Sequence, residues 1–318
     1  MGRPYRVGFA CSPLRDASPE DIVRWGQRAE DLGWEGVFIP ESFNDSLAYA
    51  QAVAMRTSRI TVGTAITNVY LRHPTLLAQQ AAAVQEFSNG RLLLGLGVGH
   101  RAVNTQLGID MGEPLVRLRD VIGVLRSAWT QGGHQPRPKT LPRILTAALA
   151  LRAIDLAGEL ADGVIFNLFP LARYPHALAA LRAGAERTGR DPATLEVCHF
   201  TTCYLSDDRR AALHEAKRML ARYANLQFYG NMLAQSGFRA EVRAVRAAWR
   251  RRDVQGAEAA VSDEMADATT LAGDPAHCRE RVHAYLMAGA TMVIVFTNPV
   301  GEPRAAAVER TLTALAPR

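Results

Sequence analysis

Seven short segments of this chain place small polar or titratable residues directly after apolar runs. These segments hold Cys11 and Ser12; Glu41 and Ser42; Thr64, Ala65, Ile66 and Asn68; Val98, Gly99 and His100; Thr146, Ala147, Ala148 and Leu149; Asn167; and Thr297 and Asn298. The set contains one carboxylate and one imidazole, and it has no cluster of His, Cys, Asp and Glu at metal-ligand spacing. The sequence has no Walker loop, and the glycines at 95, 97 and 99 do not match the GxGxxG dinucleotide pattern. A set so poor in acids and bases favours a reaction whose difficult chemistry is carried by a bound organic cofactor.

The elements that would position these segments are strands that alternate with helices. Apolar runs rich in β-branched residues predict strands at residues 5–10, 36–40, 60–67, 91–98, 143–146, 163–167, 195–205 and 291–297. Ser18 before Pro19 and Asp274 before Pro275 mark two helix starts. This α/β alternation, with a closing helix at 302–315, favours a (β/α)8 TIM barrel over an open doubly wound sheet. Because the carboxyl ends of barrel strands share one mouth, the seven segments are expected to meet there.

One domain is expected to span residues 1–318, since the chain has no tandem short repeat and no low-complexity tract. Residues of about 224–267 predict helices without strand alternation, which we interpret as a helical insertion in the C-terminal half. Four arginines of this region, Arg239, Arg243, Arg246 and Arg250, recur at helical spacing and form one stripe. We interpret the stripe as a solvated helix face or a contact for an anionic cofactor tail or substrate. No nucleic-acid motif accompanies it, so a nucleic-acid partner is not expected.

Composition and cysteine usage are those of an ordinary globular protein, with 48% apolar residues, 21% charged residues and a net charge of +6. No signal h-region and no stretch of roughly 20 apolar residues occurs, which predicts a cytoplasmic protein without a membrane partner. The four cysteines contain no CxxC pair, and buried free thiols are favoured over a metal site or a disulfide. Cys198 and Cys203 share one predicted strand at an odd separation, so they should point to opposite faces.

Several short motifs together resemble the bacterial luciferase-like superfamily. They are Pro40-Glu41-Ser42; RITVGTA from Arg59; Arg72-His73-Pro74; Ser88-Asn89-Gly90-Arg91 followed by LGLGVG from Leu94; and Leu156-Ala157-Gly158-Glu159 followed by Ala161-Asp162-Gly163. The resemblance covers most of residues 5–168 and the last predicted strand, and it is closest to the F420-dependent oxidoreductases. It implies a TIM barrel that binds a flavin or the deazaflavin coenzyme F420 at the carboxyl ends of the strands. It also implies a homodimer.

The resemblance further implies roles for individual residues. A non-proline cis peptide within residues 64–66 would form a bulge behind the deazaflavin, with a plain buried strand end as the alternative. Glu41 matches an acidic position at the hydroxylated chain of the cofactor, although an exposed acid after a strand is also a common helix cap. Val98 and Gly99 would offer backbone groups near the ring or would serve only as turn residues. His100 would donate a proton beside the carbon that receives hydride, or would cap a turn.

At three places the sequence departs from the family pattern, and each departure changes what the resemblance implies about the site. Ser42 replaces the usual active-site histidine, which disfavours abstraction of a hydroxyl proton there and leaves Ser42 as a candidate catalytic residue. Residues 146–149, Thr-Ala-Ala-Leu, replace the Gly-Gly pair that cradles the cofactor phosphate, although N–H groups at the following helix start could still bind it. The segment before the fifth strand is short, which predicts an open mouth suited to a large substrate such as a peptide or a carrier-bound intermediate.

The sequence therefore predicts an F420-dependent oxidoreductase that uses reduced deazaflavin to deliver hydride to an electron-poor double bond of an organic substrate. Asn68 and Asn167 complete the predicted cofactor contacts, and no metal ion is expected. The alternatives are an FMN-dependent monooxygenase of the same superfamily and a non-catalytic cofactor-binding paralogue. Ser42 and the missing Gly-Gly pair motivate the second alternative.

Overall fold

Eight parallel strands pair side by side and close into a barrel in the computed structural model, which describes residues 5–13, 16–41, 44–131 and 137–317. In order around the barrel they are β1 (Val7–Ala10), β2 (Gly36–Ile39), β3 (Thr61–Thr64), β5 (Leu92–Gly97), β6 (Arg143–Ala147), β7 (Gly163–Asn167), β8 (Glu196–Leu205) and β10 (Met292–Thr297). β10 pairs with both β8 and β1, which closes the ring. The predicted α/β fold, a (β/α)8 TIM barrel, is confirmed.

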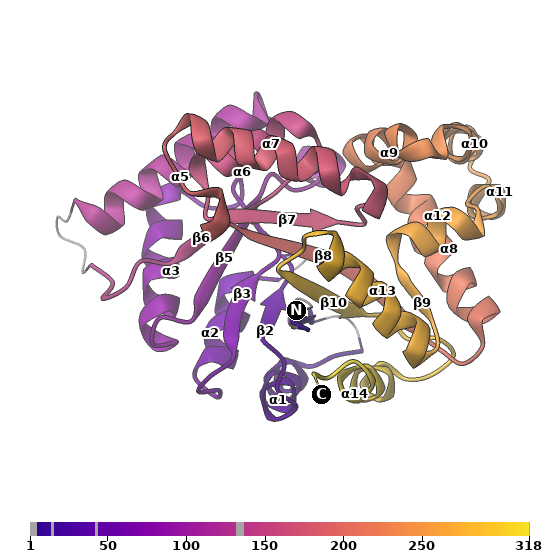
Figure 1. Ribbon diagram of the computed structural model, residues 1–318, viewed down its shortest axis with the longest axis horizontal. Helices are drawn as coiled ribbons and strands as arrows, with labels where there is room; N and C mark the ends of the chain where they lie inside the picture. The colour runs from indigo at the N-terminus through magenta and orange to yellow at the C-terminus, as the bar shows by residue number, and fades with distance from the viewer. Residues whose placement is uncertain (1–4, 14–15, 42–43, 132–136, 318) are drawn as a thin grey trace.

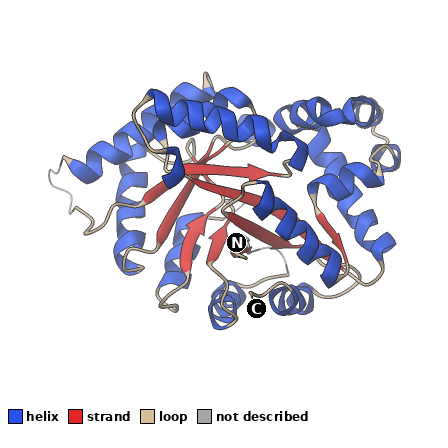
Figure 2. Cartoon of the chain, in the orientation of Figure 1, coloured by secondary structure: helices blue, strands red, loops and turns tan. Residues whose placement is uncertain are grey.

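Helices surround the barrel on its outside (Figure 2). They include α1 (Pro19–Asp31), α2 (Ser46–Ala54), α3 (Pro74–Phe87), α5 (Pro114–Thr130), α6 (Leu151–Leu160), α7 (Tyr174–Arg187), α13 (Pro275–Ala288) and α14 (Arg304–Ala314). Ser18 caps α1 in a capping box with Asp21, and Asp274 caps α13, as the sequence predicts. Within the described ranges, every helix falls short of the length and apolar character that a bilayer crossing requires.

Side chains of the strands divide between two apolar cores. Those that point inward fill the barrel, among them Phe38, Leu93 and Ile165, while their neighbours along each strand pack under the helices. Cys198 lies inside the barrel and Cys203 in the outer layer, so their predicted opposite orientation is confirmed. All four cysteines are buried free thiols, as predicted. The same alternation decides which residues at the strand ends face the mouth.

The chain that follows β8 forms a group of helices beside the mouth. α8 (Arg209–Asn225) leads to α9 (Gln227–Leu233), a π-helical turn (Ala234–Phe238), α10 (Arg239–Arg250), α11 (Val254–Ala259) and α12 (Asp263–Thr269). The short strand β9 (Leu271–Gly273) then pairs with the end of β8. Figure 1 shows α9 to α12 on the side toward which the arrow of β7 points, which is the carboxyl end of the barrel. These helices can therefore supply side chains to the mouth.

The third predicted strand, residues 60–67, is interrupted. β3 ends at Thr64, and the peptide bond between Ala65 and Ile66 is cis, within the tripeptide that the resemblance indicates. The chain then forms a separate short strand, β4 (Thr67–Asn68), which pairs with the end of β5. The polar connection after β5 contains one short helix, α4 (Arg101–Gln106).

Candidate active site

Small residues at the carboxyl ends of the strands form the floor of the mouth. Ala65 and Ile66 pack against the barrel core, and both are partly exposed, as is Ala147. A Cβ atom on Gly97 would lie 2.6 Å from Cγ1 of Ile66 and 3.4 Å from Cβ of Ala147, so Gly97 lies between these two side chains. Because no side chain projects from Gly97, Ile66 packs directly onto its backbone, and the small floor at this point is formed by Ile66 and Ala147.

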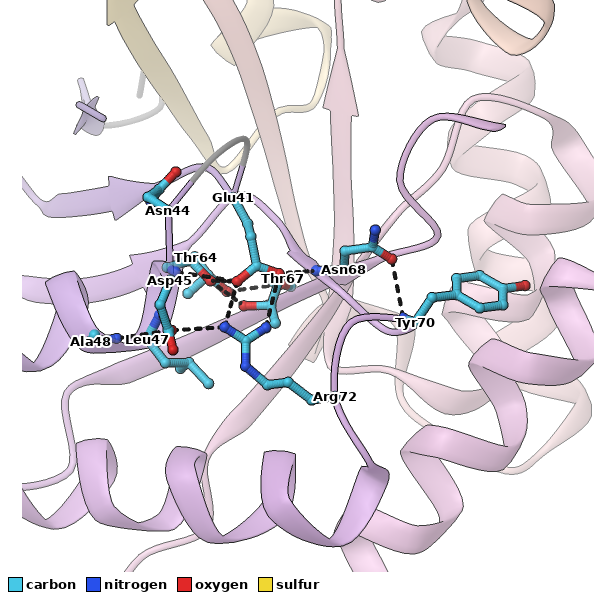
Figure 3. Close-up of polar contacts among 12 residues, drawn as sticks. Glu41, Asn44, Asp45, Leu47, Ala48, Thr64, Thr67, Asn68, Tyr70 and Arg72 are labelled. Atoms are coloured by element: carbon cyan, nitrogen blue, oxygen red, sulfur yellow. Dashed lines mark hydrogen bonds and ion pairs between the residues drawn. The ribbon is translucent and has the colours of Figure 1, made fainter. Parts of the chain in front are cut away.

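The carboxylate of Glu41 is buried after β2 and connects the neighbouring loops (Figure 3). It accepts hydrogen bonds from both terminal nitrogens of Arg72 at 2.9 and 2.6 Å, from the backbone and hydroxyl of Ser46, and from the backbone N–H of Asn68 at 2.8 Å. Glu41 is not an exposed acid, because its side chain is 1% exposed and an arginine from another loop pairs with it. Its contact with the backbone N–H of Ser46, at the start of α2, agrees with the alternative of a helix cap. Five donors fill the lone pairs of a carboxylate, so a cofactor hydroxyl would have to displace one of them. Direct cofactor binding by Glu41 stays a prediction.

Two asparagines connect this corner to the loop after β5. Asn68 donates from Nδ2 to Oδ1 of Asn104 at 2.9 Å, and Asn104 donates from Nδ2 to the carbonyl of Val98 at 2.9 Å. Gly99 has a φ of 64°, and a Cβ atom there would lie 2.6 Å from Nδ2 of Asn68. A glycine is therefore required for both the turn and the close approach. The predicted residues Asn68, Val98 and Gly99 thus lie together and fix the position of His100 at the rim.

His100 lies in an aromatic cluster with Tyr223 and Tyr229. Its ring centroid is 6.0 Å from that of Tyr223 and 5.7 Å from that of Tyr229, and the two tyrosines meet edge to face at 4.8 Å. Burial lowers the pKa of His100 below its ordinary value, because the imidazolium ion loses solvation there. The imidazole is therefore mostly neutral at pH 7, which makes it a poorer proton donor than an exposed histidine would be.

Asn167, at the end of β7, joins this cluster through Tyr229. Its Nδ2 donates to the Tyr229 hydroxyl at 2.8 Å, while its Oδ1 is buried and has no hydrogen-bond partner among the described residues. Ile165, two residues earlier on the strand, points into the barrel core. Side chains two residues apart on a strand point to the same side, so Asn167 points into the mouth. An unpartnered buried acceptor costs about 1–3 kcal/mol, and a bound molecule with a donor group would remove that cost.

The segment predicted to replace the phosphate cradle leads from β6 into α6. Thr146 is buried and its hydroxyl oxygen has no partner among the described residues, while Ala148 donates its N–H to the carbonyl of Ile165 at 3.2 Å. Leu149 is partly exposed, and Ala150 precedes α6 without a side-chain cap. A helix start that no side chain caps can accept an anion from a ligand.

The remaining predicted residues contribute less, and residues that were not predicted also join the site, among them Arg72, Asn104, Tyr223 and Tyr229. The Thr64 hydroxyl donates to the carbonyl of Gly95 at 2.8 Å, which ties β3 to β5 and uses the only proton that this hydroxyl could donate to a ligand. Ser42 lies outside the described residues. The motifs did not indicate the pairing of Arg72 or the cluster of Tyr223 and Tyr229. The only sequence signal for the tyrosines is their place in and beside the region predicted as a helical insertion.

The mouth therefore combines a floor of small residues with hydrogen-bonding groups at its rim. Glu41 is fully engaged and His100 is mostly neutral, so neither offers a free strong acid or base at pH 7. Such an arrangement suits the binding of a planar ring and the orientation of a second molecule over it.

Comparisons with known proteins identify relatives of this chain. A model of the luciferase-like monooxygenase family matches residues 6–292. A 5,10-methylenetetrahydromethanopterin reductase of Methanolobus tindarius is 26% identical over 314 residues, which cover 91% of this chain and 93% of the relative. The solved structure of a coenzyme F420-dependent tetrahydromethanopterin reductase of Methanopyrus kandleri has a TM-score of 0.83 at 24% identity, covering 99% of this chain and 98% of the other. An F420-dependent secondary alcohol dehydrogenase with an F420-acetone adduct has a TM-score of 0.75 at 17% identity, covering 99% and 98%. These two structures share the fold of this chain.

Proposed function

Because this chain belongs to the luciferase-like monooxygenase family, we propose that it is an F420-dependent oxidoreductase that reduces an electron-poor double bond of an organic substrate. The observation that carries the proposal is the floor of small side chains at the barrel mouth, where Ile66 packs directly onto Gly97 beside Ala147. The solved reductase with the same fold is F420-dependent, which supports deazaflavin as that ring. When bound, reduced deazaflavin would supply the hydride, while the protein supplies binding and orientation.

The residues of the mouth fit such a cofactor. Ala65, Ile66 and Ala147 would lie under the ring, and a Cβ atom on Gly97 would push Ile66 toward it. The backbone of Val98 would lie beside the ring, held by Asn104. The start of α6, which no side chain caps, would accept the phosphate of the cofactor.

Titration of the purified protein with each cofactor tests the choice between F420 and FMN. We expect oxidised F420 to bind with a Kd at least about tenfold lower than that of FMN, because its longer anionic tail adds charge-assisted contacts to a chain of net charge +6. Quenching of cofactor fluorescence measures both values. Tighter binding of FMN, with flavin-dependent consumption of oxygen, would support the monooxygenase instead. Failure to bind either would favour neither enzyme.

Gly97→Ala is expected to weaken the binding of F420 by about tenfold or more, because the new methyl group would overlap Ile66 and raise the floor under the ring. The measurement is the same fluorescence titration, with the thermal midpoint as a test of folding. Gly123→Ala is the matched control, since Gly123 lies on the exposed face of α5 with no atom within 4 Å of an added Cβ. An unchanged Kd in a folded Gly97→Ala protein would mean that the ring lies elsewhere.

A further inference from the structure

We propose that Tyr229 donates a hydrogen bond to a carbonyl oxygen of the substrate and that Asn167 positions it, which makes the substrate an alkene conjugated to a carbonyl group. The inference rests on the proposed function, in which reduced deazaflavin supplies the hydride. It adds the group that stabilises the charge formed during the reduction, and it adds the chemical class of the acceptor.

Tyr229 reaches the mouth from α9 and bridges the ends of two barrel strands. Its hydroxyl lies 2.8 Å from Nδ2 of Asn167 at the end of β7, and its ring lies 5.7 Å from that of His100 after β5. β6 lies between these strands and ends in Ala147, which contributes only a methyl group to the floor. The phenol thus lies at the rim beside the part of the floor assigned to the ring.

The hydrogen bonds of this pair leave the proton of Tyr229 unused. Asn167 donates to the phenol oxygen, so the hydrogen of the phenol needs a different acceptor. None is found for it among the residues that the structure describes. Oδ1 of Asn167 likewise has no hydrogen-bond donor among the described residues. A free donor, the Tyr229 O–H group, and a free acceptor, Oδ1 of Asn167, therefore lie side by side. The donor suits a carbonyl oxygen of a substrate, and the acceptor suits an N–H or O–H group beside that carbonyl.

Burial also distinguishes Tyr229 from His100 as a donor. It raises the pKa of Tyr229 far above the ordinary value of 10.0, because the phenolate would lose its solvation. It lowers the pKa of His100, so the imidazolium form is scarce at pH 7. Tyr229 consequently keeps its proton at neutral pH, whereas His100 does not gain one.

A carbonyl group conjugated to the reacting double bond makes use of this donor. When the β-carbon gains hydride, the electron pair of the C=C bond shifts and negative charge develops on the carbonyl oxygen. The Tyr229 hydroxyl donates a hydrogen bond to that oxygen and stabilises the enolate that forms, while its own O–H bond stays intact. Water then gives a proton to the α-carbon, which yields the saturated ketone and hydroxide. Overall, the substrate gains one hydride and one proton.

Infrared difference spectra of bound 2-cyclohexen-1-one test this contact without turnover. A donated hydrogen bond lowers the carbonyl stretching frequency, so we expect a lower frequency in the wild-type protein than in Tyr229→Phe. Tyr223→Phe is the control, because Tyr223 packs edge to face on Tyr229 without bonding to Asn167. Asn167→Ala is expected to broaden the carbonyl band, because the phenol is then no longer held. Equal frequencies in wild type and Tyr229→Phe would overturn the inference, as would an enone that does not bind.

Oxidation of reduced F420 by the same enone gives the kinetic test. We expect Tyr229→Phe to lower kcat by about 100-fold with the Kd of F420 within about threefold of wild type. Tyr49→Phe, on α2 outside the barrel, is expected to leave kcat nearly unchanged. A kcat of Tyr229→Phe close to wild type would overturn the inference. A wild-type protein that binds F420 but does not reduce the enone would also overturn it, while leaving the cofactor assignment intact. Failure of the wild-type protein to bind F420 would instead overturn the proposed function.

Discussion

Glu41→Gln is expected to lower the free energy of unfolding by about 3–5 kcal/mol, because it removes the buried partner of an ion pair and leaves the Arg72 guanidinium with only the more exposed carboxylate of Asp45. The side chains of Glu41 and Arg72 are 1% and 10% exposed. Glutamine preserves the shape but replaces one acceptor oxygen with an NH2 group, which would face a donor of Arg72 or Asn68. Denaturant unfolding at pH 7, extrapolated to zero denaturant, measures the change.

Asp45→Asn is the matched control, because it changes the other carboxylate beside the same guanidinium. Asp45 lies 2.7 Å from Arg72, but its side chain is 41% exposed, and asparagine is also a good cap for α2. We expect this variant to lose at most about 1 kcal/mol. Equal losses in the two variants, or a Glu41→Gln protein as stable as wild type, would contradict the assignment of Glu41 as the buried anchor.

The same contacts limit what Glu41 can do for a bound cofactor. Its oxygens hold Ser46 at the start of α2 and Asn68 just after the Ala65–Ile66 peptide, so they fix two loops that shape the mouth. A cofactor hydroxyl would compete with donors already in place. We therefore expect Glu41 to affect cofactor binding through the position of Asn68 and not through contact.

The barrel can be predicted from the sequence because its signals are local. Ser18, Asp45 and Asp274 each accept a hydrogen bond from a backbone N–H within three residues, and such helix starts are visible in a short window. The opposite orientation of Cys198 and Cys203 follows in the same way from the two-residue period of one strand. Local periodicity therefore defines the elements and their order around the mouth.

Contacts between distant segments explain what the sequence does not reveal about the site. A single acidic residue after a strand is normally interpreted as solvent-exposed. Glu41 is instead buried and pairs with Arg72, which lies 31 residues further along the chain. Tyr229 likewise meets Asn167 across 62 residues. Neither pairing produces a periodic pattern in the sequence, because each depends on how the loops and helices pack over the barrel. The fold could thus be predicted in outline, whereas the partners of the site residues could not.

A second large effect concerns acid stability and depends on His199, in the core between the barrel and the helices. The imidazole is fully buried, its Nδ1 lies 2.9 Å from the Tyr174 hydroxyl, and its ring stacks on Tyr285 at 3.7 Å. Its Nε2 has no hydrogen-bond partner among the described residues. Burial, and to a smaller degree the positive charge of Arg281, lower the pKa of His199 to about 3.

Between pH 7 and pH 4 the protein is expected to lose about 3 kcal/mol of unfolding free energy through His199 alone. The unfolded chain binds this proton near pH 6.5, whereas the folded protein binds it only near pH 3, so acid favours the unfolded state across that window. The contribution is complete above pH 6.5 and is lost as the pH falls toward 3. Denaturant unfolding of His199→Gln should lack this part of the slope, because glutamine does not titrate, while His214→Gln on the exposed face of α8 should retain it. A constant difference in stability between wild type and His199→Gln from pH 7 to pH 4 would mean that the folded protein protonates His199 as readily as the unfolded chain does.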